Sequence, residues 1–311
     1  MIDREEFYYD SCDGKTKIRA LKWKPDKEPV AVFQIVHGMA EHIERYDGFA
    51  RYLANKGYIV VANDHIGHGK SVTTNENWGY FCEKNAVDVL INDANNLRVK
   101  TQNEYSELPY FILGHSMGSF ILRNYITRYG DGLSGAIIMG TGDIDSRLIN
   151  MGKKLVSVMA KFKGWKYKSK FVSQLVVDNN NKHFKNDEYT KCWLTKDRDI
   201  VKQYIEDPAS GFRFTLNGFN TLFDLAKEMA KPENIKKIPT NLPVLMVSGE
   251  EDYLGQCGKG VLRVYKTLSN AGINDITWKL YPTDRHEILN ELDKEDVYKD
   301  IEAWLNVRLK S

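Results

Sequence analysis

Apolar, strand-length segments that alternate with helical segments predict an α/β protein with a mostly parallel central sheet and helices on both faces. Apolar runs at residues 30–36, 58–62 and 110–113 are short enough for strands and lack a polar face. Helical spacing follows each of them, as it does where crossover helices join parallel strands. Before these runs, residues 5–9 and 17–23 alternate in polarity, and we expect them to form an antiparallel hairpin.

The later elements keep this rhythm, with one long interruption. We expect helices at residues 45–56, 86–97, 117–129, 260–270 and 297–309, and further strands at residues 133–139, 243–247 and 275–281. Gly57 is a suitable C-terminal cap for the first of these helices.

The interruption, residues 142–237, is rich in lysine, asparagine and aromatic residues and shows no strong strand pattern. We therefore predict a core of residues 1–141 and 238–311 with a helical cap, residues 142–237, inserted into it. The whole chain has 44 basic and 42 acidic residues, a net charge of +2. The insertion holds 19 basic and 12 acidic residues, so the core is negative.

Composition and charge argue against several classes of protein. Hydrophobic residues make up 42% and charged residues 28% of the chain, which is typical of a globular protein rather than a disordered or fibrous one. The nearly balanced charge argues against a nucleic-acid-binding protein. The four cysteines are scattered and indicate neither a zinc site nor a disulfide framework. The chain starts without a signal-peptide pattern and has no membrane-length apolar run, so we expect a cytoplasmic protein.

Residues 114–118, Gly-His-Ser-Met-Gly, match the pattern G-x-S-x-G. They follow a predicted strand and precede a predicted helix, which is the setting of a nucleophile elbow. We expect Gly114 and Gly118 to leave room in a turn too tight for a Cβ atom. Ser116 would lie at the C-terminal edge of the sheet, near the positive end of the following helix. The alternative is a serine that only caps that helix.

A serine hydroxyl needs a base to become a good nucleophile, and in this type of fold the chain order is serine, acid, histidine. Two histidines follow Ser116. His183 lies in a polar stretch of the insertion, which we interpret as a surface loop. His286 follows the last predicted strand, where a loop returns to the C-terminal edge of the sheet. We therefore predict that His286 is the base.

The acid is expected after the strand at residues 243–247, where Glu250, Glu251 and Asp252 follow one another. We predict Asp252, because three residues of turn let its carboxylate swing back toward the histidine. Its role would be to orient the imidazole and stabilise its charged form. Glu250 and Glu251 are expected to be solvated. Asp143, which follows the strand at residues 133–139, is the alternative acid.

Two backbone N–H groups are needed to stabilise the oxyanion, one from Met117 and one from the loop after an early strand. That loop is His-Gly-Met-Ala-Glu-His, residues 37–42. We expect Met39 to be the second donor and Gly38 to permit unusual backbone angles.

Five motifs in this order resemble the monoacylglycerol lipase and lysophospholipase group of the α/β-hydrolase fold, the S33 type. They are residues 37–42, Asn-Asp-His-Ile-Gly-His-Gly-Lys-Ser at 63–71, residues 114–118, Gly-Glu-Glu-Asp at 249–252 and His-Glu at 286–287. The resemblance runs from about residue 24 to the C-terminus, and the insertion matches that family's cap in position only.

The resemblance implies Ser116 as nucleophile, Asp252 as acid and His286 as base, with oxyanion donors at Met39 and Met117 and no cofactor. It also implies that residues 64–69 form a structural loop. His65 and His68, three residues apart in that loop, therefore receive no catalytic role, and no further ligand cluster supports a metal site.

These observations predict a serine ester hydrolase that forms an acyl-enzyme. The resemblance implies a small amphiphilic substrate, a monoacylglycerol or a lysophospholipid. Alternatives are a short-chain carboxylesterase, an amidase or aminopeptidase, and a binding protein that has lost catalysis. Proline iminopeptidases share the fold but favour His-Gly-Gly-Pro-Gly and a tryptophan after the nucleophile, so residues 37–42 and Met117 favour esters.

The insertion suggests two further contacts. The resemblance implies an apolar tunnel for one acyl chain in the insertion, with nine candidate lining residues: Phe162, Trp165, Phe171, Trp193, Phe212, Phe214, Phe219, Leu222 and Phe223. The alternative is that these residues belong to the apolar core, as most aromatic residues at helical spacing do. Seven lysines in residues 151–175 are interleaved with apolar residues, which first indicates the solvated face of a surface helix. The alternative is an interfacial patch that contacts an anionic lipid surface or the head group of an amphiphilic substrate. Cys257, five residues after Asp252, is a candidate for inhibition by thiol reagents.

Overall fold

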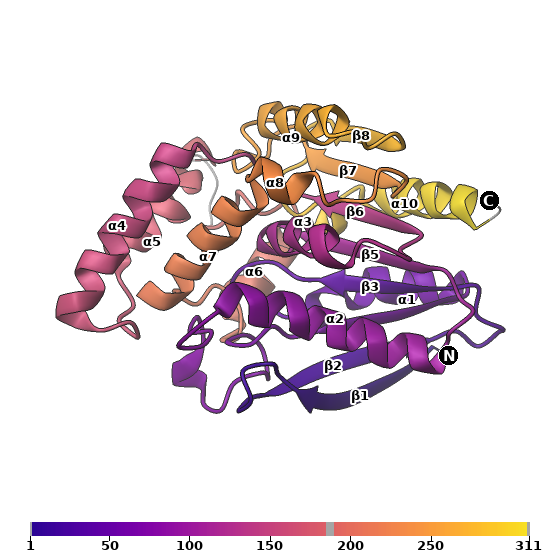
Figure 1. Ribbon diagram of the computed structural model, residues 1–311, viewed down its shortest axis with the longest axis horizontal. Helices are drawn as coiled ribbons and strands as arrows, with labels where there is room; N and C mark the ends of the chain where they lie inside the picture. Colours follow the sequence, from indigo (N-terminus) through magenta and orange to yellow (C-terminus); the bar gives the residue numbers. More distant parts are fainter. Residues whose placement is uncertain (1, 185–189, 310–311) are drawn as a thin grey trace.

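The computed structural model describes residues 2–184 and 190–309, which contain one sheet of eight strands (Figure 1). The strands are β1 (Asp3–Asp10), β2 (Lys17–Lys24), β3 (Ala31–Val36), β4 (Tyr58–Asn63), β5 (Tyr110–His115), β6 (Gly135–Met139), β7 (Val244–Gly249) and β8 (Ile276–Tyr281). Their order across the sheet is β1-β2-β4-β3-β5-β6-β7-β8. β2 pairs antiparallel with both β1 and β4, and the other pairs are parallel.

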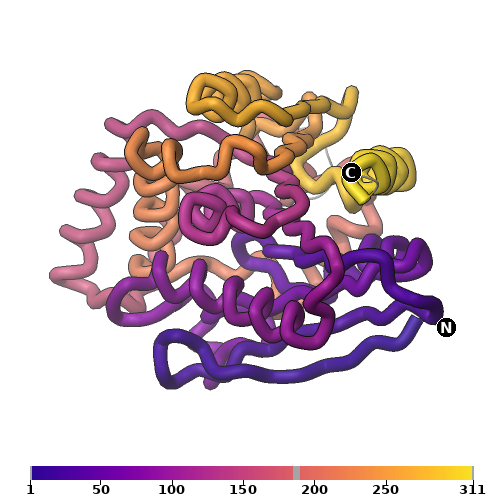
Figure 2. Tube along the Cα trace, turned by 45° about the vertical axis from the view of Figure 1, so that its right-hand side comes forward, coloured from indigo at the N-terminus to yellow at the C-terminus, as the bar shows by residue number. Residues whose placement is uncertain are grey.

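Helices cover both faces of this sheet (Figures 1 and 2). Outside residues 142–237 they are α1 (Asp47–Asn55), α2 (Ala86–Glu104), α3 (Met117–Tyr129), α9 (Lys259–Asn270) and α10 (Lys294–Arg308), with short 3-10 turns η1 (Ile43–Tyr46), η2 (Asn75–Asn77) and η4 (Ile288–Asn290). Side chains of α2, α3 and α9 share one apolar core, and those of α1 and α10 share another. Alternate residues of β3 serve the two cores, because successive side chains of a strand point to opposite faces.

The strands and helices expected from periodicity are all present, and the predicted mostly parallel sheet is confirmed. Only boundaries differ. The helix expected to end near residue 97 continues to Glu104, because Arg98 and Thr101 are also buried on its inner face. The helix expected from residue 45 begins at Asp47, after a 3-10 turn.

Residues 142–237 contain helices and, where the structure describes them, no strand, as expected. The elements are α4 (Ser146–Lys163), α5 (Lys170–Val176), η3 (Asp178–Phe184), α6 (Arg198–Glu206), α7 (Leu216–Met229) and α8 (Pro232–Ile235). Side chains of Asp145, Ser169, Asp197 and Thr215 accept hydrogen bonds from the first turns of α4, α5, α6 and α7. α7 packs against α3 and α4, so that α4 and α5 lie outermost (Figure 1).

Gly118 lets α3 lie directly against the end of β3. A Cβ atom at this position would lie 2.0 Å from the carbonyl oxygen of Val36 and 2.5 Å from that of His37. Backbone cannot move aside as a flexible side chain does, so α3 and β3 would have to separate.

We therefore expect Gly118→Ala to lower the free energy of unfolding by about 3 kcal/mol, because overpacking forces the backbone to shift. Gly48→Ala is the control: it lies in the exposed face of α1, and the nearest atom to its added Cβ is 3.5 Å away. That control should gain up to about 1 kcal/mol from helix propensity. Urea denaturation measures both, and equal stability of the two variants would contradict the packing argument.

Candidate active site

Ser116 lies in a strained turn between β5 and α3. Its φ of 54° and ψ of −120° fall in a region that non-glycine residues rarely adopt, at a cost of about 1–3 kcal/mol. The Ser116 amide donates to the carbonyl of Met139 at 3.0 Å, and its own carbonyl accepts from the Ser119 amide at 2.9 Å. The Ser116 hydroxyl makes no capping hydrogen bond to α3, so the interpretation as a simple helix cap is wrong.

The glycines around this turn are explained by space. A Cβ on Gly114 would lie 2.3 Å from the carbonyl oxygen of Gly118, as the predicted tight elbow requires. A Cβ on Gly38 would lie 2.6 Å from Glu41 Oε1 and 3.1 Å from the Cβ of Ser116. Gly38 does not have a positive φ, whereas Ala40 does, at 53°. The expectation that Gly38 permits unusual backbone angles is therefore wrong: it permits close approach to Ser116.

His286 and Asp252 form a buried hydrogen-bonded pair. His286 Nδ1 lies 3.0 Å from Asp252 Oδ2, and Asp252 also accepts from the Leu254 amide at 3.0 Å and from the Ser248 hydroxyl at 3.2 Å. Asp252 follows the end of β7 and His286 follows the end of β8, neighbouring parallel strands whose C-terminal ends meet at one edge. The sequence-predicted acid and base are thus brought together.

The pKa shifts of the two residues suit a pair in which His286 serves as the base and Asp252 holds it in place. Burial opposes the charge on Asp252, but the charge of His286 and the hydrogen bonds to Asp252 outweigh it, so the pKa of Asp252 lies below its ordinary 3.8. Burial lowers the pKa of His286, but the charge and hydrogen bond of Asp252 outweigh this effect, with smaller contributions from Glu287 and Glu41. The pKa of His286 therefore lies above its ordinary 6.5.

The alternatives to this pair lie elsewhere. Asp143 is bound to Arg263, with 2.9 Å between Oδ2 and Nε, and so does not replace Asp252. Glu250 is exposed and the Glu251 side chain is 46% exposed, as expected. His183 is exposed and stacks on Tyr253, with ring centroids 3.6 Å apart.

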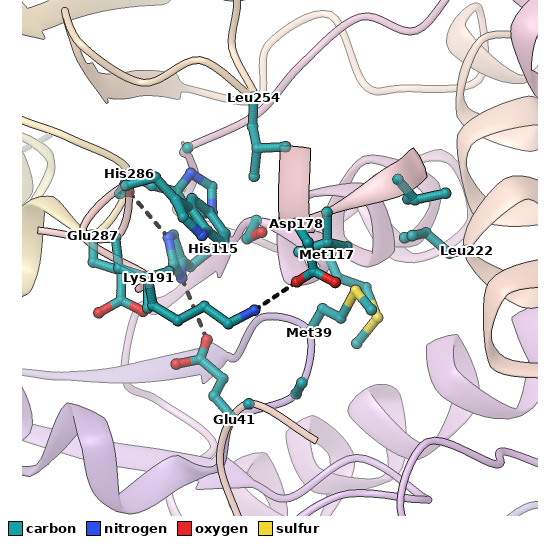
Figure 3. Close-up of a pocket in the computed structure, with 18 of the residues that line it drawn as sticks. Met39, Glu41, His115, Met117, Asp178, Lys191, Leu222, Leu254, His286 and Glu287 are labelled. Carbon is teal, nitrogen blue, oxygen red and sulfur yellow. Dashed lines mark hydrogen bonds and ion pairs between the residues drawn. The ribbon is translucent and has the colours of Figure 1, made fainter. Parts of the chain in front are cut away.

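Ser116 lines a cavity of about 500 Å³. His286, Met39 and Met117 line the same cavity (Figure 3). Asp252 lies behind His286 and does not line the cavity. Among the hydrogen bonds of residues 2–184 and 190–309, none links the backbone amide of Met39 or Met117 to a side chain or to the backbone of a loop. None of them links the side chains of Ser116 and His286 either. In unliganded active sites the serine–histidine hydrogen bond is often long or poorly aligned, and it tightens when substrate binds.

Known proteins share this architecture and chain length. A sequence model of the family described as "Serine aminopeptidase, S33" matches residues 27–293. The chain belongs to this family.

Its relatives include a monoacylglycerol lipase of Mycolicibacterium smegmatis, which is 27% identical over 94% of both chains. A thermostable carboxyl esterase from Bacillus coagulans, solved with glycerol, is 30% identical with a TM-score of 0.89 and covers 99% of this chain and 100% of that one. A monoglyceride lipase from Saccharomyces cerevisiae has a TM-score of 0.76 at 21% identity, covers 98% of this chain and 94% of that one, and shows the α/β-hydrolase fold.

Sequence reasoning missed a charged network in this S33-family site. Arg45 Nη1 donates to Glu41 Oε2 at 2.7 Å, and both Arg45 Nη atoms donate to Glu287 at 2.7 Å. Glu41 and Glu287 line the cavity, and all three side chains are at most 10% exposed. The spacing of four residues between Glu41 and Arg45 was a signal for one of these ion pairs. No local pattern links either residue to Glu287.

A second ion pair lies inside the cavity. Lys191 Nζ is 2.7 Å from Asp178 Oδ1, and Ser173 donates to the other carboxylate oxygen of Asp178 at 2.8 Å (Figure 3). Both charged residues belong to the insertion, and sequence reasoning assigned neither of them to the site.

His65 and His68 are buried beside the oxyanion loop, which we define as residues 37–42. The His65 amide donates to His37 Nε2 at 2.9 Å, and its own Nε2 lies 3.0 Å from the His37 carbonyl oxygen. Burial lowers the pKa of His65 to about 4 and that of His68 to about 3, so both are neutral at pH 7. No metal-binding group of three side chains occurs among the described residues. His65 is thus hydrogen-bonded to the oxyanion loop, and the His68 ring packs near that of His37, with ring centroids 5.2 Å apart.

Three of the nine proposed tunnel residues line the cavity: Trp193, Phe212 and Leu222. The others are divided between the apolar core, which holds Phe214, Phe219 and Phe223, and the exposed surface, which carries Phe162, Trp165 and Phe171. Helical spacing does not distinguish these outcomes, because it identifies an apolar face without identifying what that face contacts.

Cys257 is exposed and does not line the cavity. Its amide donates to the Asp252 carbonyl at 2.9 Å, and burial together with the charge of Asp252 raises the pKa of its thiol. No helix in the described residues is long and apolar enough to cross a membrane.

A pH profile tests the His286–Asp252 pair. His286 accepts a proton only when neutral, and its pKa is raised, so the acid limb of kcat/KM on an ester should have its midpoint above pH 6.5. Asp252→Asn should move this midpoint down and lower kcat by about 10⁴-fold. Glu251→Gln is the matched control and should stay within about twofold of wild type. Equal losses in the two variants would show that Asp252 is not the acid.

Proposed function

We propose that this chain is a serine hydrolase of single-chain lipid esters, monoacylglycerols or lysophospholipids. The observation that carries the proposal is the strained Ser116 in one cavity with His286, which is itself hydrogen-bonded to the buried Asp252. The lipase and esterase names among its relatives support the ester as the bond cleaved.

The proposed reaction proceeds through an acyl-enzyme. Ser116 Oγ attacks the ester carbonyl while His286 Nε2 takes its proton, and the amides of Met39 and Met117 stabilise the oxyanion. Asp252 keeps Nδ1–H in place and stabilises the imidazolium. His286 then gives its proton to the leaving alcohol. A water molecule, activated by His286, releases the carboxylic acid and regenerates Ser116.

The lining of the cavity supports an acyl chain as the bound group. Apolar side chains from the core and from residues 142–237 face the space around Ser116: Phe120, Ile144, Val176, Leu194, Leu222 and Leu254. Because both parts of the chain contribute, we propose that residues 142–237 act as a cap over the nucleophile. A cavity of about 500 Å³ lies within the range of about 300–1,000 Å³ that is usual for small-molecule sites.

Initial rates on p-nitrophenyl esters from C2 to C16, on 1-monooleoylglycerol and on lysophosphatidylcholine test this function. We expect a maximum at C10 or longer, with turnover of at least one of the two lipids. Ser116→Ala should lower the rate by about 10⁴-fold or more and leave the Tm near that of wild type. A maximum at C2–C4 without lipid turnover would instead indicate a small-ester hydrolase, and cleavage of anilides alone would indicate an amidase.

We also propose that α4 and α5 contact anionic lipid surfaces. Large apolar side chains on and between these helices are exposed: Leu148, Met151, Val158, Phe162, Trp165, Tyr167, Phe171 and Leu175. Phe162 is 83% exposed and lies between Lys161 and Lys163. Of the seven lysines in residues 151–175, Lys153 alone has a carboxylate partner in the described part of the chain. Free ammonium groups beside exposed apolar side chains suit the interface of a charged bilayer.

Vesicle binding tests this contact. The variant Phe162→Ser, Lys161→Gln, Lys163→Gln should bind vesicles containing phosphatidylglycerol at least about 30-fold more weakly, since each of the two lysines near an anionic surface contributes about 1 kcal/mol and Phe162 adds apolar contact. Its control, Leu292→Ser, Lys236→Gln, Lys237→Gln, removes two ammonium groups and one large apolar side chain from exposed positions elsewhere and should bind like wild type. Added salt should weaken the binding of the wild-type protein to these vesicles. Equal binding of both variants would leave the lysines as a solvated helix face.

A further inference from the structure

Arg45 connects two loops that meet at Ser116. One is the oxyanion loop, which Arg45 reaches through Glu41. The other is the histidine loop, defined as residues 284–287, which Arg45 holds through a bidentate pair with Glu287, the neighbour of His286. Bidentate guanidinium–carboxylate pairs fix direction as well as distance.

Contacts on the oxyanion loop pin both sides of Met39. Glu41 Oε1 accepts from the Gly38 amide and from the Tyr46 hydroxyl, at 2.5 and 2.7 Å. On the other side of Met39, the carbonyl of Ala40 accepts from the Gly211 amide at 2.8 Å. The Met39 amide therefore lies between two fixed peptide groups, and its direction depends on where Glu41 is held.

Contacts on the histidine loop hold His286 in a similar way. The Glu287 amide donates to the Leu194 carbonyl at 2.7 Å, and Asn290 donates to Glu287 Oε2 at 3.0 Å. His115 Nε2 lies 3.3 Å from the carbonyl oxygen of His286. Arg45 itself does not line the cavity that holds Ser116, so it acts on the reaction through its neighbours. These are its two carboxylate partners and the Tyr204 ring, whose centroid lies 4.7 Å from the guanidinium.

We infer that Arg45 is a positioning residue that sets the oxyanion donor Met39 and the base His286 relative to each other, through Glu41 and Glu287. This inference rests on the proposed function, because it needs an oxyanion and a base at these places. It extends that function by making the alignment of two loops, distant in sequence, depend on one buried guanidinium.

The charges around His286 predict a second consequence. Asp252 faces the imidazole from the loop after β7, Glu287 comes from its own loop, and Glu41 and Arg45 come from the segment after β3, while His115 approaches from the end of β5. The network of two carboxylates and one guanidinium is negative by one charge. It therefore favours the imidazolium, and removing the charge of Glu287 should make His286 less basic.

Steady-state rates on the p-nitrophenyl ester that wild type hydrolyses fastest test the inference. Arg45→Met should lower kcat by about 100-fold with KM changed less than about threefold, because misplaced catalytic groups slow the chemical step more than binding. Arg45→Lys should recover only part of the lost kcat, because its ammonium group cannot hold both carboxylates in the geometry that the guanidinium imposes. The rate of inactivation by a fluorophosphonate should fall in parallel. Arg51→Met, which removes a partly exposed arginine paired with Asp47 on α1, is the control and should match wild type.

Glu287→Gln keeps the shape of the network and removes one charge. It therefore tests the inference even if Arg45→Met fails to fold. It should lower kcat about tenfold and move the acid limb of kcat/KM to lower pH. Two results would overturn the inference. In the first, folded Arg45→Lys and Glu287→Gln keep kcat within twofold of that of Arg51→Met, and the acid limb of their pH profiles does not move. In the second, these variants change KM alone. A wild type that neither hydrolyses esters nor reacts with the fluorophosphonate overturns the proposed function instead.

Discussion

The tight turn at residues 114–118 is the constraint on which the rest of the site depends. Parallel strands end at one edge of the sheet, and α3 can begin directly at that edge only because Gly118 permits contact with the carbonyl of Val36. The turn forces Ser116 into a positive φ and leaves its hydroxyl out of the helix cap. The cost in local strain is offset by the packing around the turn.

Around this turn, the buried charges form two groups. Asp252 is held by His286 and by amide and hydroxyl donors, and Glu41 and Glu287 share Arg45. Buried carboxylates without such partners would take up protons or destabilise the fold. Both groups lie at the two loops that flank Ser116. The electrostatics of the site and the alignment of its backbone N–H groups therefore depend on the same contacts.

Residues 142–237 carry two apolar surfaces with different surroundings. One side of α7 and the segment before it packs on α3 and completes the cavity, where Phe212 and Leu222 line the space near Ser116. The outermost helices, α4 and α5, expose Phe162, Phe171 and other large side chains among lysines. A helix buried against the core on one side and apolar on the other suits a lipid surface better than water.

The sequence by itself determined the order of strands and helices along the chain, the elbow at Ser116 and the pairing of Asp252 with His286. Strand and helix periods are local patterns, and so is the position of a polar residue in the loop that follows a parallel strand. Tertiary structure alone decided the role of Gly38, which three of the nine candidate residues line the cavity, and the link from Arg45 to Glu287. That link joins residues 242 positions apart, and Gly38 meets Ser116 only after β3 and β5 pair. Such contacts depend on how elements pack together, and periodicity within one element does not contain that information.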